Sequence, residues 1–228
     1  MEFIAEGFVK AVVLLLQGDA ETWSAIVVTL RVTMLSMTAS LLLGIPLGFL
    51  LGYQPFAGRR QIRMVVDTLL FLPTVFVGLL VYAFISSRGP LGEAGLLFTV
   101  PGIAVGQTIL ALPIVMSLAA SATEETAGRL RVTLMSLGAN RRQLFLTSLW
   151  ETRQGIVAAG LVACGRVMTE VGISMMVGGN IKWHTRTITT AIALETNKGL
   201  FAMGIALGMV LMVIAFSVNL GAMLLKRK

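Results

Sequence analysis

The sequence predicts an all-α integral membrane protein with about five transmembrane helices and an N-terminal interfacial helix. Hydrophobic residues make up 56% of the 228 residues, charged residues make up only 13%, and the mean hydropathy is +0.88. Soluble domains carry about a quarter charged residues, so most of this chain must face lipid or other apolar helices. A second observation is a series of long uncharged stretches, since about 20 apolar residues cross a bilayer as a helix.

Five segments are long enough to be spans. The first two overlap uncharged stretches of 27 and 20 residues, at 32–58 and 68–87, and the third lies within an uncharged stretch of 30 residues, at 94–123. The fourth is less regular, because it contains Arg166 and Glu170. The expected spans are residues 23–52, 65–87, 100–122, 155–177 and a helix between 198 and 226.

Residues 1–22 are predicted to form a separate interfacial segment, and residues 23–228 form the transmembrane domain. The apolar run at residues 11–16 is too short to cross a membrane, and Phe8 adds to an amphipathic pattern typical of interfacial helices. The first ten residues carry two glutamates and one lysine, so we expect no cleaved signal peptide.

Basic residues predict the orientation, because cytoplasmic loops are enriched in lysine and arginine. A cytoplasmic C-terminus places 11 basic residues inside, namely Arg59, Arg60, Arg63, Arg129, Arg131, Arg141, Arg142, Arg153, Lys226, Arg227 and Lys228. The outer segments then hold five, namely Lys10, Arg88, Lys182, Arg186 and Lys198. We therefore expect the N-terminus outside and the C-terminus in the cytoplasm.

Glycines recur at four-residue spacing within three of the spans. Such faces let membrane helices approach closely, which predicts a tightly packed bundle. The positions are Gly44, Gly48 and Gly52, then Gly102 and Gly106, then Gly204 and Gly208. Prolines within spans are expected to kink their helices at Pro46, Pro73 and Pro113.

The longest predicted cytoplasmic loop, residues 123–154, has the pattern of two helices. Leucines at helical spacing precede Gly138, which breaks the pattern, and Asn140 is a suitable N-cap for the second helix. The periodicity and the central turn predict a stiff cytoplasmic knob that docks into a partner. A basic loop lying on the membrane is the alternative that charge alone would allow.

The stretch SLGANRRQLFLTSL, residues 136–149, resembles the cytoplasmic coupling loop of type I ABC importer permeases, in which a Glu-Ala-Ala triplet precedes Leu-Gly-Ala. This sequence departs from that pattern at residues 132–134, which are Val-Thr-Leu, and at residues 150–151, which are Trp-Glu. The resemblance implies contact with an ATPase through Leu137, Gly138, Ala139, Asn140, Arg141, Arg142 and Phe145.

A second stretch, GRVMTEVGISMMVGGNIKWHTRTITTAI, resembles permeases for sulfate, molybdate and tungstate. The matching positions are Arg166, Glu170, Gly172, Gly179, Asn180, Thr185, Arg186 and Thr187. The stretches RGPLGEAGLLFT and GQTILALPIV are most similar to tungstate-type permeases. The resemblance extends from about Glu6 to the C-terminus and implies the type I ABC importer permease fold.

This resemblance implies a permease subunit of an ATP-driven oxyanion importer, for tungstate or molybdate, in the cytoplasmic (inner) membrane of a bacterium or archaeon. Its implied partners are an ATPase subunit dimer, an extracytoplasmic substrate-binding protein and membrane lipid. Five spans are too few to enclose a path, so a second copy of the chain is expected to form a homodimer. Tungstate, molybdate and sulfate are tetrahedral dianions of similar size, so physical chemistry does not distinguish them. The choice of tungstate or molybdate rests on the family resemblance alone.

Two groups of polar residues are candidates for a direct role in transport. Arg166 and Glu170 are four residues apart on one helical face. We favour a structural ion pair over contact with the oxyanion in the translocation path, although ionisable residues within spans are usually functional. Asn180, Thr185 and Arg186 lie in the predicted outer loop, where an acidic rim of a binding protein could dock; a solvated loop has the same composition.

Other classes of function fit less well. An ATP-independent secondary anion transporter is the alternative, but such proteins often show internal repeats and none is evident here. The chain lacks a Ser-His pair, metal-ligand spacing and a nucleotide-binding loop, so no catalytic residue, metal or cofactor is expected, and ATP hydrolysis is assigned to a separate chain. The net charge of +7 is explained by membrane anchoring, so no nucleic acid partner is expected.

Overall fold

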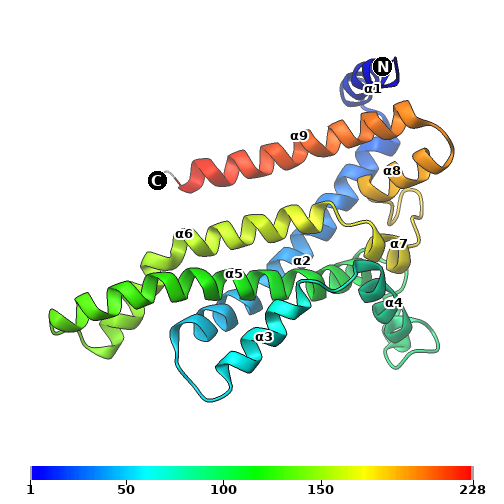
Figure 1. The fold of residues 1–228 in the computed structure, drawn as a ribbon. Coiled ribbons are helices and arrows are strands. Elements are labelled where there is room, and N and C mark those ends of the chain that lie inside the picture. The colour runs from blue at the N-terminus through cyan, green and yellow to red at the C-terminus, as the bar shows by residue number, and fades with distance from the viewer. Residues whose placement is uncertain (1, 227–228) are drawn as a thin grey trace. The chain divides into compact units, whose positions relative to one another are not determined.

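The computed structural model describes residues 2–226, and within them every regular element is helical, as the sequence predicts. The chain runs from the N-terminus to the C-terminus through helices that Figure 1 labels in order. They are α1 (Glu2–Leu16), α2 (Ala20–Tyr53), α3 (Arg59–Leu69), α4 (Thr74–Ile85), η1 (Gly92–Ala94), α5 (Val100–Ser136), α6 (Arg141–Met168), α7 (Gly172–Gly178), α8 (Ile188–Asn197) and α9 (Phe201–Lys226).

Three of the described helices, α2, α5 and α9, are each long and apolar enough to cross a membrane. Two further spans are possible as bent pairs, in which α3 and α4 meet at 97° and α6 and α7 meet at 57°. Length and composition thus allow up to five spans, which agrees with the predicted membrane protein. The second expected span is interrupted between Leu69 and Thr74, where a kink at Pro73 was predicted, and the fourth is interrupted between Met168 and Gly172, where no break was predicted.

The break before α4 has a local cause. Pro73 is the N-cap of α4, with φ −62° and ψ 125°, and it has no N–H group to continue the α3 ladder. Proline also disfavours helical geometry in the residue before it, Leu72, so the helix cannot continue through residue 72; α3 ends at Leu69 and the chain turns. Pro46 and Pro113, by contrast, lie inside the continuous helices α2 and α5.

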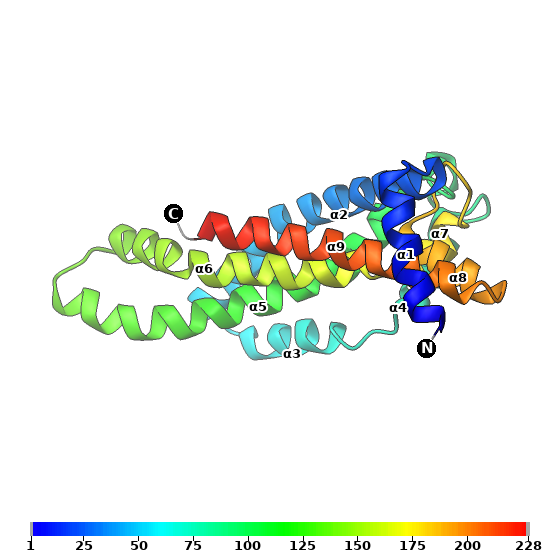
Figure 2. The same ribbon diagram turned by 90° about the horizontal axis from the view of Figure 1, so that it is seen from above.

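The chain divides into two compact units. Unit 1 comprises residues 1–36, 73–107 and 165–228, and unit 2 comprises residues 37–72 and 108–164. Within unit 1, α1 packs on α9, α8 packs on α9 and α4 packs on α7, as Figures 1 and 2 show. Its core includes the fully buried side chains of Ile103, Ile173 and Ile188.

Unit 2 depends on close approach between the C-terminal half of α2 and the middle of α5. A Cβ atom at Gly48 would lie 2.6 Å from the carbonyl oxygen of Met116, and one at Gly52 would lie 2.5 Å from that of Ala120. The predicted glycine contact is confirmed on this face. At Gly208 of α9, however, a Cβ would meet nothing within 4 Å among the described residues, so that glycine is not needed for packing here.

We predict that Gly48→Ala destabilises the protein, because the new methyl group would overlap the α5 backbone, which cannot move as a flexible side chain can. Overpacking of this kind typically costs about 1–3 kcal/mol. Thermal unfolding in mild detergent should show a lower Tm. Gly208→Ala is the matched control, and an equal fall in both variants would contradict the packing argument.

Candidate functional site

The break between α6 and α7 places a carboxylate in the interior of unit 1. The Glu170 side chain is 2% exposed, and its Oε2 lies 3.3 Å from a guanidinium nitrogen of Arg166, whose side chain is 46% exposed. The other carboxylate oxygen accepts a hydrogen bond from the backbone N–H of Ile173 at 3.2 Å, in the first turn of α7. The Glu170 carboxylate therefore forms the ion pair with Arg166 and also caps the start of α7.

Hydroxyl groups satisfy the backbone where the helix is interrupted. The carbonyl oxygen of Glu170 accepts hydrogen bonds from Thr189 Oγ1 at 2.9 Å and from Ser174 Oγ at 3.4 Å. Thr189 is held at the start of α8 by a capping box formed by Thr187 and Thr190. Because lipid offers no hydrogen bonds, a broken helix is tolerated there only where other groups supply them.

The same hydrogen bonds extend to α2 and α5. Thr29 Oγ1 accepts from the N–H of Ile188 at 2.9 Å. Gln107 Nε2 donates to Ser174 Oγ at 3.3 Å, and Ser36 Oγ donates to Gln107 Oε1 at 3.4 Å. We call this set the polar network; its members are Thr29, Ser36, Gln107, Glu170, Ser174, Thr187 and Thr189, and all are buried.

The polar network is a close-packed structural element rather than an open binding site. The gap that most of its members line has no room for a water molecule. Sequence reasoning identified Glu170, but it missed the serines and threonines. The one feature of the sequence that could have indicated these serines and threonines is the presence of small hydroxyl side chains within uncharged stretches. Within residues 2–226, no group of three or more His, Cys, Asp or Glu side chains is arranged to hold a metal ion.

The predicted outer-loop residues form hydrogen bonds and ion pairs within unit 1. Thr185 is buried, and its Oγ1 donates to the carbonyl of Gly178 at 2.5 Å. Arg186 Nε donates to Asn180 Oδ1 at 3.2 Å, and its guanidinium forms an ion pair with Glu21 at the start of α2. Glu21 also pairs with the amine of Lys182 at 2.7 Å.

The segment around these residues differs from the prediction in two ways. A helix, α8, occupies part of the expected loop, and it starts with its own capping box. The basic charge is also partly neutralised by Glu21, which lies 165 residues from Arg186 in the sequence. The predicted outer segment therefore offers less free positive charge than its composition indicates.

The turn between α5 and α6 has the predicted glycine and cap. Gly138 has φ 77°, and the N–H of Ala139 donates to the carbonyl of Leu134 at 3.0 Å. Asn140 Oδ1 accepts from the N–H of Gln143 at 2.9 Å, and Gln143 Oε1 accepts from the N–H of Asn140 at 2.9 Å. This reciprocal cap fixes the start of α6. The two predicted helices are continuations of α5 and α6 rather than separate short helices.

The side chains at this turn point in different directions. Leu137 is 76% exposed, and Arg141 and Arg142 are also exposed. Phe145 instead packs edge-on against Phe49 and Tyr53 of α2, with ring centroids 5.4 and 5.5 Å apart. Phe145 thus braces the turn from within unit 2, and the exposed residues form its tip.

Comparison with known proteins identifies the family. No protein-family profile matches the chain. A tungstate uptake system permease protein TupB from Campylobacter jejuni is 48% identical over 100% of this chain and 95% of its own length. The chain belongs to the tungstate and molybdate family of ABC transporter permeases.

Further relatives agree with this assignment. A tungstate uptake permease from Peptoclostridium acidaminophilum is 35% identical over 96% of each chain. A molybdenum transport system permease protein ModB from Escherichia coli K12 is 30% identical, over 75% of this chain and 78% of its own. The permease described here is thus a multi-pass membrane transport subunit, and the resemblance stated from its motifs is confirmed.

We predict that Glu170→Ala destabilises this permease more than Glu170→Gln. Alanine removes both the cap on the N–H of Ile173 and the partner of Arg166, whereas glutamine keeps an acceptor for the cap. Leaving a buried donor unsatisfied costs about 1–3 kcal/mol, so the alanine variant should show the larger fall in Tm in detergent. Glu195→Ala, which removes a pair with the exposed Lys198, is the control. Equal Tm values for all three variants would contradict the assigned role.

Proposed function

We propose that two copies of this permease form the translocation path of an ATP-driven tungstate or molybdate importer. The turn between α5 and α6 would couple that path to a separate ATPase subunit. The observation that carries the proposal is this turn, which is rigid in its backbone and exposed in its side chains. The printed names of the relatives support the choice of tungstate or molybdate.

The turn has the physical properties that force transmission requires. Its backbone is fixed by the glycine and the reciprocal cap, and Phe145 ties its base to α2. Its surface carries exposed apolar side chains, namely Val132, Met135, Leu137, Leu146 and Trp150. Apolar groups gathered on a polar, basic segment mark a surface for protein association. Because α5 and α6 continue from the turn into the apolar segments, displacement of the tip would move the spans.

The homodimer follows from the number of spans. The described residues of one copy form at most five spans and leave large apolar side chains exposed, and a two-fold axis lets two copies enclose a path. Within each copy, we assign the half-exposed Arg166 to the wall of that path and the buried Glu170 to a structural ion pair with it. The half-exposed arginine would attract an oxyanion, and Glu170 would keep the anion from binding tightly.

The remaining parts of the assembly follow the same proposal. A substrate-binding protein would deliver the oxyanion to the outer segment that contains Asn180, Thr185 and Arg186. The N-terminus would lie outside and the C-terminus in the cytoplasm of a bacterium or archaeon, as the distribution of basic residues predicts. Selection among oxyanions would then reside mainly in the binding protein.

We predict that Gly138→Val uncouples ATP hydrolysis from transport. Gly138 has positive φ, where a residue with a side chain costs roughly 1–2 kcal/mol, and valine would distort the turn. ATP hydrolysis stimulated by the loaded binding protein should fall about tenfold in the assembled transporter, the factor that corresponds to ~1.4 kcal/mol. Gly128→Val, on the same helical arm in open space, is the control. Unchanged stimulation of ATP hydrolysis in a folded, assembled Gly138→Val transporter would contradict the proposal.

We also predict that Leu137→Glu weakens association with the ATPase without changing the stability of the permease. The side chain is exposed, so its replacement leaves the packing of unit 2 intact while placing a charge in an apolar interface. Co-purification should recover less ATPase, and Tm should stay unchanged. The exposed Leu91, outside the α5–α6 turn, provides a control as Leu91→Glu. Equal ATPase recovery from both variants would argue against docking at this tip.

A further inference from the structure

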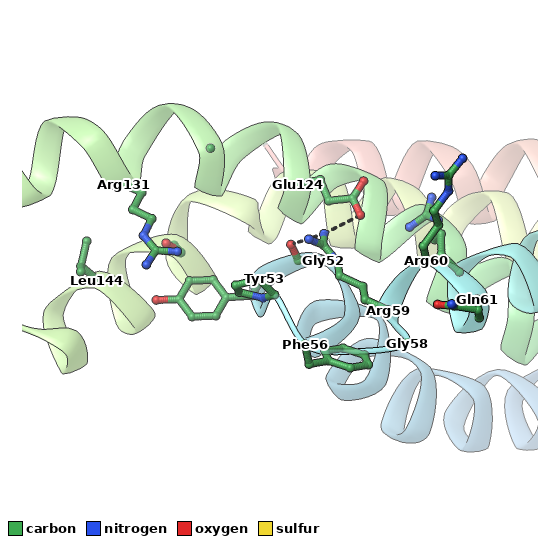
Figure 3. A pocket seen from close by; sticks show the side chains of 14 residues that line it. Gly52, Tyr53, Phe56, Gly58, Arg59, Arg60, Gln61, Glu124, Arg131 and Leu144 are labelled. Atoms are coloured by element: carbon green, nitrogen blue, oxygen red, sulfur yellow. Dashed lines mark hydrogen bonds and ion pairs between the residues drawn. The ribbon is translucent and has the colours of Figure 1, made fainter.

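Unit 2 contains a pocket lined by basic side chains where α2 ends and α3 begins (Figure 3). Its volume is about 800 Å³, and α5 and α6 complete its walls. Four arginines and one carboxylate contribute to the lining, namely Arg59, Arg60, Arg63, Arg131 and Glu124. We call it the arginine pocket.

Two of the four arginines are fixed by the protein itself. Arg59 donates to the carbonyl oxygens of Leu51 and Gly52 at 2.7 and 3.0 Å, and it pairs with Glu124 at 2.7 Å. These bonds satisfy carbonyls at the C-terminal end of α2.

Arg63 is held in the same way by neighbouring polar groups. It pairs with Asp67 at 3.0 Å and donates to Ser121 Oγ at 2.5 Å. Its third guanidinium nitrogen, Nη1, is buried without a hydrogen-bond partner among the described residues. The two fixed arginines and their carboxylates therefore form a nearly neutral frame for the pocket.

The other two arginines supply charge that this frame does not compensate. Arg60 on α3 and Arg131 on α5 are exposed, and in the described part of the chain neither forms a hydrogen bond or ion pair. Figure 3 shows Arg131 extending from α5 toward Tyr53. The α3 N-terminus adds to this potential, because its N-cap is Gly58, which provides no side-chain acceptor for the first N–H groups.

The surroundings of the pocket match the boundary between lipid and water. On α3, the apolar side chains of Ile62, Val65 and Leu69 are exposed and lie at helical spacing. The arginines of α3 lie in the first half of the helix. Helices of this composition lie at membrane interfaces. The apolar span of α2 ends at Tyr53, which lines the pocket together with Phe56.

We propose that the arginine pocket binds the phosphate group of an anionic phospholipid. Guanidinium groups match the oxygen atoms of phosphate in geometry and charge, and basic pockets between membrane helices bind acidic headgroups. The assignment to the cytoplasmic leaflet rests on the orientation in the proposed function. A free tetrahedral oxyanion presents similar oxygen atoms, so the test must separate the two sources.

The test is native mass spectrometry of the full-length permease, titrated in mild detergent with phosphatidylglycerol or with phosphatidylcholine of the same acyl chains. The natural protein should retain phosphatidylglycerol preferentially. Each basic residue near an acidic surface contributes about fivefold, so R60Q/R131Q should weaken that preference at least about tenfold. R60K/R131K should keep most of the preference, because the charge remains.

The control variant, R88Q/R153Q, removes the same net charge outside the pocket and should stay within about twofold of the natural protein. Equal retention of the two lipids by the natural protein, or an equal loss in both double variants, would overturn the proposal. If R60Q/R131Q does not fold, R131Q alone should lose about fivefold.

A competition arm separates the lipid from a free anion. Millimolar phosphate or tungstate should leave phosphatidylglycerol bound; displacement from the natural protein would assign the pocket to a free oxyanion and overturn the lipid assignment. The measurement contains no ATPase, so its failure would leave the coupling proposal standing. Failure of the Gly138 test would equally leave a positive lipid result intact.

Discussion

Hydrogen bonding of the backbone inside the membrane is the constraint on which this structure depends. A continuous helix satisfies its own N–H and C=O groups, so every interruption within an apolar segment needs partners from elsewhere. The break between α6 and α7 meets that need through the carboxylate of Glu170 and through Ser174 and Thr189. The polar network is therefore what allows an apolar chain to bend at this point.

Unit 2 carries the exposed turn between α5 and α6 at the end of these two long helices. Close contact at Gly48 and Gly52 fixes α2 against α5, and Phe145 fixes the base of α6 against Phe49 and Tyr53. These contacts hold the base of the α5–α6 hairpin, and its exposed tip at Leu137 extends beyond them. In the proposed function, a partner that pulls on Leu137 would move the helices that continue from the turn.

Much of this arrangement could be predicted from sequence, because local chemistry determines it. Uncharged stretches marked the apolar helices, Gly138 and Asn140 marked the turn, and the four-residue spacing of Arg166 and Glu170 marked their pair. The rest depends on partners distant in the chain. Glu21 neutralises Arg186 from 165 residues away, and Thr189 bonds the carbonyl of Glu170 from another helix. The predicted outer segment was therefore expected to be a loop, although part of it is the capped helix α8 and its basic charge is partly paired. Similarly, the break within the fourth span was not predicted, because its residues do not reveal which hydroxyl groups would satisfy the interrupted backbone.

The central claim is that this permease works as one part of an ATP-driven assembly and has no independent transport cycle. The most direct measurement is the mass of the intact complex, purified gently from its own membranes and measured by native mass spectrometry. The account predicts two permease copies with two ATPase subunits. A homo-oligomer that reproducibly lacks any ATPase would contradict it and would favour an ATP-independent anion transporter.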